Sequence, residues 1–394
     1  MKRVVWIGLV LAACSGADDG ERSGDAGPRD AGVTGPRDGG PRDAGAHDAG
    51  AHDAGASDGG HRDAGPRDAG ARDAGPAPEV GTATAVDVCT PNPNLPSASC
   101  EVVQIQTDGN PTIFVRLHIA RSVRRERGVV IFGSGTGGGG AYFDGSVGTN
   151  RLRDALLADG FVIVERQWDG PSGGWFSGDT DQGLVGRSAR YATLVEYVHT
   201  THRSAADVPL CVTGNSGGAA EIGYALGAWQ IDRWVDVAIP TSGPIDDLRD
   251  ACWGDTDRPD YFTSCDAEWD DRVADGLSIC SGRRSCQVNA EALVNATFVG
   301  EPCGPTGPPS PADLARLEAD SPHRGHRPTC AVRVLVGEGD CGGVVPQGTR
   351  WADRLASDGA DATWAFVAGA RHGVMHVEAG ATAIRDVLLA ECVE

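Results

Sequence analysis

The stretch Cys211-Val212-Thr213-Gly214-Asn215-Ser216-Gly217-Gly218 contains the pattern G-x-S-x-G. Residues 208–213 before the serine are mostly apolar and β-prone, while residues 219–228 after it are rich in helix-forming types. A serine on a sharp strand-to-helix turn needs neighbours without side chains, and Gly214 and Gly218 meet that need. The stretch therefore predicts a strand, a turn and a helix, and it nominates Ser216 as a nucleophile.

Short apolar runs alternate with helical patterns along the rest of the chain. Two early runs predict an antiparallel hairpin, and the later runs are typical of buried parallel strands. We expect strands at 101–106, 112–119, 129–132, 161–165, 208–213, 234–239, 333–336 and 363–367, and helices at 150–158, 187–202, 219–228 and 381–392. This order predicts the α/β class, with a mostly parallel sheet covered by helices on both faces.

Composition divides the 394 residues into unequal parts. Residues 15–78 repeat units such as Pro-Arg-Asp-Ala-Gly and carry an aspartate at every fifth position from Asp38 to Asp73. They have too few large apolar side chains to form a core, so we predict a disordered linker followed by one folded domain at 79–394. The formal net charge of −21 argues against a nucleic-acid partner, because phosphate binding needs clustered Lys and Arg.

The first fourteen residues have the form of a secretory signal. Lys2 and Arg3 precede an apolar run at 4–13 that is too short to span a bilayer. The run ends in Leu11-Ala12-Ala13-Cys14, which resembles the lipobox of bacterial lipoproteins. That resemblance implies lipidation of Cys14 and a place in the bacterial cell envelope, with Ser15 pointing to the outer membrane or cell surface. Ordinary signal cleavage, which would give a secreted protein, is the alternative.

Cysteine usage also indicates export. Twelve cysteines less Cys14 leave eleven, a density typical of an oxidising compartment. Cys89 and Cys100 flank a short loop and predict a local bridge; we expect Cys341 to pair with Cys392 and Cys211 to stay unpaired inside its strand. Six more cysteines lie between 252 and 330, and their fifteen possible arrangements stay open. No Cys or His spacing fits a zinc site, so we expect no metal and no cofactor.

The order of elements, together with the strand, sharp turn and helix around Ser216, resembles the α/β-hydrolase superfamily from about residue 87 onward. In that family the triad follows the order serine, acid, histidine. The resemblance places the acid after the strand at 333–336, where Asp340 is our choice and Glu338 its rival. It places the base on the glycine-containing loop after the last strand, where we choose His372 over the nearby His376.

The resemblance also implies backbone donors for an oxyanion. One is the N–H of Gly217, directly after the nucleophile, and the other comes from the glycine loop at 133–140, through Thr136 or Gly137. Ser134 stands where the family often has histidine, which leaves the register of this loop open. A phosphate-binding loop would end in Gly-Lys-Ser/Thr, whereas Ala141 and Tyr142 follow here.

An insertion of about 90 residues, at about 243–330, is longer than an ordinary connection and predicts a disulfide-rich cap. Its aromatic residues could line a cleft or pack inside the cap, and the same choice is open for Trp168, Trp175 and Phe176. The resemblance implies a monomeric serine hydrolase that cleaves a small-molecule or polymer carboxylic ester. A serine peptidase of the same fold and a non-catalytic surface binding protein are the alternatives.

Overall fold

Nine strands form a single sheet in the computed structural model, which describes residues 77–135, 137–169, 174–177, 182–251, 302–303, 310–323, 325–340 and 344–393. The strand order is β1-β2-β3-β5-β4-β6-β7-β8-β9. The strands are β1 (Thr82–Val88), β2 (Ser99–Gln106), β3 (Ile113–Arg121), β4 (Gly128–Gly133), β5 (Phe161–Trp168), β6 (Leu210–Asn215), β7 (Val237–Thr241), β8 (Ala331–Gly337) and β9 (Ala362–Val367). From β5 to β9 across the sheet all neighbours are parallel, which confirms the predicted class.

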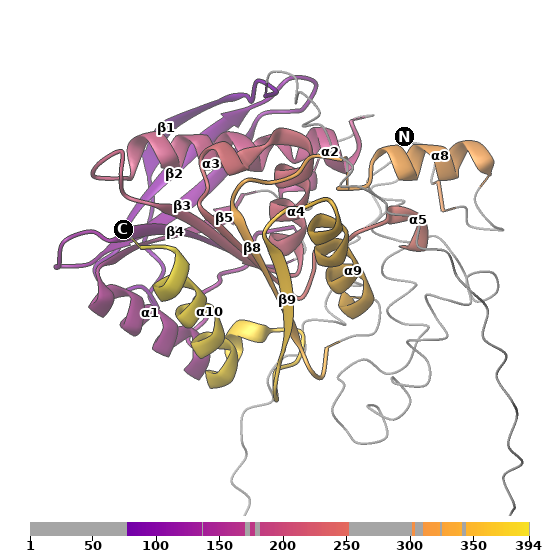
Figure 1. Cartoon of the computed structure of the whole chain (residues 1–394). Coiled ribbons are helices and arrows are strands. Elements are labelled where there is room, and N and C mark those ends of the chain that lie inside the picture. The colour runs from indigo at the N-terminus through magenta and orange to yellow at the C-terminus, as the bar shows by residue number, and fades with distance from the viewer. Residues whose placement is uncertain are drawn as a thin grey trace, which may run out of the picture. The chain divides into compact units, whose positions relative to one another are not determined.

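Helices cover both faces of this sheet. They are α1 (Val147–Asp159), α2 (Gly183–Arg187), α3 (Ala189–Thr201), α4 (Gly217–Trp229), α5 (Leu248–Ala251), α8 (Pro311–Ala319), α9 (Val344–Ser357) and α10 (Glu378–Glu391), with short 3-10 turns η2 (Gly174–Phe176), η3 (Ile231–Arg233) and η4 (Val374–His376). Figure 1 shows α1 and α10 side by side on one face, while α3, α4 and α9 lie on the other. Within the described part of the chain, no helix combines the length and apolar character needed to cross a bilayer.

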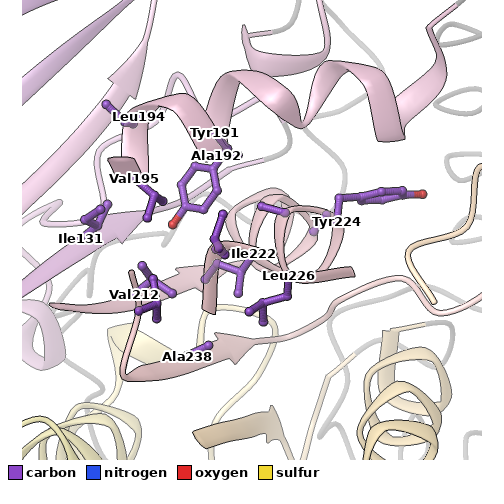
Figure 2. Close-up of a cluster of buried hydrophobic side chains, with 14 of the residues drawn as sticks. Ile131, Tyr191, Ala192, Leu194, Val195, Val212, Ile222, Tyr224, Leu226 and Ala238 are labelled. Atoms are coloured by element: carbon purple, nitrogen blue, oxygen red, sulfur yellow. The ribbon is translucent and has the colours of Figure 1, made fainter. Parts of the chain in front are cut away.

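Each face of the sheet has its own hydrophobic core. Along β4, Val129 and Ile131 face the core that includes α3 and α4, whereas Val130 and Phe132 face the core that includes α1 and α10. Successive side chains of a strand point to opposite faces, so a strand buried on both sides reads as a continuous apolar run. Figure 2 shows the first core, where α3 and α4 pack over the central strands.

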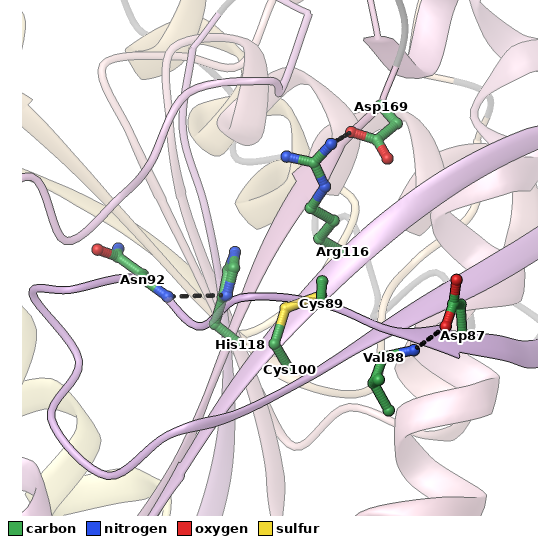
Figure 3. The surroundings of a disulfide bond; sticks show 8 residues. All are labelled: Asp87, Val88, Cys89, Asn92, Cys100, Arg116, His118 and Asp169. Carbon is green, nitrogen blue, oxygen red and sulfur yellow. Dashed lines mark hydrogen bonds and ion pairs between the residues drawn. A yellow bond between two sulfur atoms is a disulfide. The ribbon is translucent and has the colours of Figure 1, made fainter.

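The antiparallel end of the sheet begins with an unexpected strand. β2 and β3 form the predicted antiparallel pair, and β1 adds to β2 at the edge. Most residues of β1 are exposed, and its sequence Thr-Ala-Thr-Ala-Val-Asp-Val has only small apolar side chains in an alternation that breaks at the register shift between Ala85 and Asp87. The predicted bridge between Cys89 and Cys100 is present, beside a loop in which the Asn92 N–H donates to His118 Nδ1 at 3.1 Å (Figure 3).

The second disulfide corrects the expected pairing. Cys211 of β6 is bonded to Cys392, just after α10, so Cys211 is not unpaired and Cys392 does not pair with Cys341. The reason is the packing of α10 under the sheet, which brings its end to the buried side of β6. Cys330 is free and buried, and Cys303 is disulfide-bonded.

Several expectations lie outside the described residues. These are the signal peptide at 1–14 with Cys14, nearly all of the linker at 15–78, Thr136, Cys341, and most of the cap at 243–330 with four of its cysteines and its aromatic side chains.

Candidate active site

Ser216 lies at the sharp turn between β6 and α4 that the sequence predicts. Its backbone has φ 59° and ψ −115°, a region that L-residues rarely adopt. Its N–H donates to the Thr241 carbonyl of β7 at 3.0 Å. A Cβ on Gly214 would lie 2.5 Å from the backbone of Gly218, so the strand and helix approach each other too closely for side chains at this turn.

Asp340 and His372 are joined by a hydrogen bond of 2.8 Å between Oδ1 and Nδ1. The side chain of Asp340 is fully buried, whereas 14% of the His372 side chain is exposed. An ionised carboxylate can only accept, so in this bond the ring proton lies on Nδ1 and the lone pair of the neutral ring lies on Nε2.

The two rival residues have other partners. Glu338 is exposed, and its Oε2 accepts the Gly369 N–H at 3.2 Å. His376 Nε2 lies 3.1 Å from Asp144 Oδ2. Burial opposes ionisation of Asp144, but hydrogen bonds from His376 and Ser146 outweigh it and hold the pKa of this carboxyl well below its ordinary value. Of the candidate acids and bases, the structure therefore brings together Asp340 and His372.

The loop that carries His372 is fastened to the end of β8. The Gly339 N–H donates to the Ala370 carbonyl at 2.9 Å. A Cβ on Gly337 would lie 2.2 Å from the carbonyl oxygen of Arg371, so only glycine lets the loop pass this close.

Ser216 and Asp340 lie at the same edge of the sheet. Both follow the carboxyl ends of parallel strands, β6 and β8, and β7 lies between these strands. The Ser242 N–H, just after β7, donates to Leu335 of β8 at 3.0 Å and continues the pairing toward this edge. Two interstrand spacings amount to about 10 Å between the backbones of β6 and β8.

The predicted oxyanion donors lie on two neighbouring segments. Gly217 is the first residue of α4, so its N–H is one of the four that have no partner within the helix. The glycine loop follows β4, and the carbonyl of Gly137 accepts the Trp175 N–H at 3.0 Å, which joins the loop to η2.

A buried charged network beneath the glycine loop was not predicted. Arg166 of β5 and Glu221 of α4 form an ion pair at 2.8 Å, and both side chains are fully buried. Burial raises the pKa of Glu221 to about 7, although Arg166 and a hydrogen bond from Trp168 oppose the shift. The available signal was one charge, Glu221, in the otherwise uncharged α4 and two adjacent charges, Glu165 and Arg166, in the mostly apolar β5.

The aromatic residues before α3 are part of the core. Trp168, Trp175 and Phe176 are exposed by only 3%, 2% and 8%. Of the two alternatives for these side chains, the structure therefore supports packing in the core and not contact with substrate.

Over the described ranges, no group of three or more His, Cys, Asp or Glu residues could hold a metal ion.

No family model matches the chain, and no curated protein does. Solved structures similar to it include a hyperthermophilic esterase from the archaeon Pyrobaculum calidifontis, at 17% identity and a TM-score of 0.46, and a thermostable esterase from Pseudomonas putida, at 15% and 0.47. In both cases 74% of this chain and 82% of the other are covered. An acylaminoacyl peptidase from Pyrococcus horikoshii matches at 11% identity and a TM-score of 0.46, covering 74% of this chain and 48% of the other.

Proposed function

From the α/β-hydrolase fold of this chain and the bond between Asp340 and His372, we propose that the protein is a serine hydrolase that cleaves carboxylic esters through an acyl-enzyme. The observation that carries the proposal is that hydrogen bond, at the sheet edge where Ser216 occupies its strained turn. A buried carboxylate bound to Nδ1 of an imidazole holds the ring as general-base catalysis through Nε2 requires.

In the proposed reaction, His372 Nε2 takes the proton of the Ser216 hydroxyl as the oxygen attacks the ester carbonyl. The negative charge on the carbonyl oxygen is stabilised by the N–H of Gly217 and by one from Thr136 or Gly137. Collapse of the tetrahedral intermediate breaks the ester C–O bond, and the imidazolium gives its proton to the leaving alcohol. Water then repeats the sequence on the acyl-enzyme and releases the acid, while Asp340 holds the imidazolium throughout without taking a proton.

A fluorophosphonate probe tests the nucleophile. Wild-type protein and Ser242→Ala should be labelled, and Ser216→Ala should not. Ser242 is a matched control, because it too follows a sheet strand and has a positive φ of 51°. A folded wild-type protein that takes no label would instead be a non-catalytic binding protein.

A substrate panel tests the reaction class. We expect turnover of p-nitrophenyl esters of graded acyl length and no cleavage of peptide substrates by the same preparation. Peptide cleavage that exceeds ester turnover, and that disappears in Ser216→Ala, would make the protein a peptidase with the same nucleophile.

We further propose that a lipid on Cys14 anchors the protein to the bacterial outer membrane. The support is the Leu-Ala-Ala-Cys sequence behind a basic and apolar leader. Cys14→Ser should move the protein from the membrane fraction to the soluble one and stop incorporation of labelled palmitate, whereas Ser15→Ala should leave both unchanged. Retention of Cys14→Ser in the membrane would refute the anchor.

A further inference from the structure

The guanidinium of Arg166 lies directly under the glycine loop at 133–140. Its Nη1 donates to the carbonyl of Gly138 at 2.7 Å and to that of Ser134 at 3.4 Å. The side chain has no exposed surface. In the sequence, Ser134 and Gly138 stand before and after the two proposed donor positions, 136 and 137. The carbonyls on both sides of these positions are therefore bound to one rigid, permanently charged group.

The same guanidinium is bound to the helix that begins after the nucleophile. Arg166 Nη2 lies 2.8 Å from Oε2 of Glu221, and the other oxygen of Glu221 accepts the indole N–H of Trp168 at 2.7 Å. The backbone N–H of Trp168 also donates to the Gly138 carbonyl, at 2.9 Å. Arg166 thus connects the loop to α4, whose first residue is Gly217.

Three glycines make room for this guanidinium. A Cβ on Gly133 would lie 2.4 Å from its Nη2, and one on Gly138 would lie 2.4 Å from its Nη1. A Cβ on Gly218 would lie 2.4 Å from the Gly133 carbonyl oxygen and 3.2 Å from Nη2. Real Cβ atoms do not approach other atoms as closely as 2.4 Å. Glycine at these three positions is therefore what lets the loop and helix backbones pack closely around Arg166.

We infer that Arg166, held by Glu221, is a positioning residue that sets the glycine loop against the N–H of Gly217 and so preorganises the oxyanion site. The inference rests on the proposed function. Oxyanion donors stabilise a transition state only when they are fixed before charge develops. A fraction of an ångström is enough to weaken them, and supporting contacts provide that precision.

Arg166→Met keeps much of the side-chain volume and removes all the donors. We expect its kcat to fall by about 10²-fold, the effect of losing an oxyanion donor, with KM for a p-nitrophenyl ester nearly unchanged. Arg166→Lys keeps the charge, but its single nitrogen replaces two that lie apart, Nη1 at the loop carbonyls and Nη2 at Glu221, so we expect a loss that is smaller than that of Arg166→Met. Glu221→Gln, which keeps an acceptor for Trp168, should lower kcat in the same selective way.

The decisive readout compares two inhibitors. A trifluoromethyl ketone forms a tetrahedral adduct with an oxyanion, whereas the neutral product of an alkyl ester, its alcohol, binds without a negative oxygen. Trifluoromethyl ketone affinity should fall in proportion to kcat/KM across the three variants, and product affinity should stay constant. A merely structural role would weaken both ligands together or neither, and either result would overturn the inference.

A matched control removes a buried carboxylate far from the site. Asp232 of η3 precedes the amino end of β7, at the opposite edge of the sheet, and accepts from His326 and Thr329. Asp232→Asn should lower the melting temperature and leave kcat and both affinities as in wild type.

Should Arg166→Met fail to fold, Arg166→Lys and Glu221→Gln allow the same comparison. If Asp232→Asn loses trifluoromethyl ketone affinity as Glu221→Gln does, the effect is general destabilisation and the inference is wrong.

Failure of this inference differs from failure of the proposed function. Activity that survives in Ser216→Ala removes the proposed function and the inference with it. Activity that requires Ser216 but is indifferent to Arg166 and Glu221 removes the inference alone.

Discussion

At the scale of single residues, the bond between Asp340 and His372 favours Asp340 over Glu338 as the carboxylate of the proposed triad. Asp340→Asn keeps the volume but can donate from its amide to the ring, which favours the wrong tautomer. We expect kcat to fall by about 10³- to 10⁴-fold, measured with a p-nitrophenyl ester. Glu338→Gln is the control and should remain within about twofold of wild type, because its exposed amide oxygen can still accept the Gly369 N–H. Equal losses in the two variants would contradict the assignment of Asp340.

Glu221 predicts a dependence of stability on pH. Its pKa in the folded protein is about 7, raised by burial from an ordinary value of 4.5. Between these values the folded state binds a proton that the unfolded chain releases, so this carboxyl stabilises the fold at low pH and loses that contribution as the pH rises toward 7. Glu221→Gln does not titrate, so its free energy of unfolding relative to wild type should improve from pH 5 to pH 8. Urea unfolding at both pH values measures this, and a constant difference would disprove it.

Residues with a strong local signal were predictable, and residues that depend on partners far along the chain were not. The turn at Ser216 could be predicted because glycines surround the serine, and glycines have no side chains to obstruct a sharp turn. The choice of Asp340 over Glu338 rests on the family resemblance and on the position of the acid after its strand, and the role of Asp340 stays a prediction. The pairing of Arg166 with Glu221 spans 55 residues, from 166 to 221, and no local pattern links the two.

At the scale of elements, the glycine loop contains positions that differ sharply in what they tolerate. Gly138 has φ +75°, and a Cβ there would lie 2.3 Å from Trp168 and 2.4 Å from Arg166, whereas a Cβ on Gly140 would meet nothing within 4 Å. Gly138→Ala must displace the loop and should lower kcat by about 10²-fold, the cost of a shift of about 1 Å. Gly140→Ala should keep wild-type turnover in the same ester assay. A similar loss in both would mean that the loop does not depend on its contact with Arg166.

Among the elements themselves, the buried central strands and the edge strand β9 were predicted, and the exposed edge strand β1 was not. β4 contains four consecutive apolar residues and β6 begins with three, and these runs are what predicted the two strands. β1 is mostly exposed and its alternation is short and built on small side chains, and it pairs with β2 at the edge of the sheet. Its stability comes from backbone pairing with a partner, which sequence patterns report poorly.

At the scale of the whole molecule, the two disulfides constrain the chain very differently. Cys211 and Cys392 are 181 residues apart, whereas Cys89 and Cys100 are 11 apart. Loop-closure entropy assigns roughly 5 kcal/mol to the first bridge and roughly 3 kcal/mol to the second. The double variant Cys211→Ala/Cys392→Ala should therefore lose more free energy of unfolding in urea than Cys89→Ala/Cys100→Ala. Equal losses would contradict the entropic explanation.

The same long separation explains why the pairing of Cys211 was predicted wrongly. A cysteine inside a buried strand suggests an unpaired side chain when only its neighbours in sequence are considered. The partner becomes visible once α10 is packed under the sheet, which is a property of the folded molecule. The class of fold could be predicted from alternating elements, but the cross-link that joins its centre to its last helix could not.

The strained backbone of Ser216 lowers the stability of the fold at the residue that is the proposed nucleophile. A non-glycine residue at φ 59° carries a penalty on the order of 1–3 kcal/mol, which glycine would escape. Ser216→Gly should therefore melt at a higher temperature than Ser216→Ala while both are inactive; identical melting temperatures would show that the turn carries no such penalty. A serine at a position where glycine would relieve the penalty supports the proposal that the Ser216 hydroxyl has a chemical role.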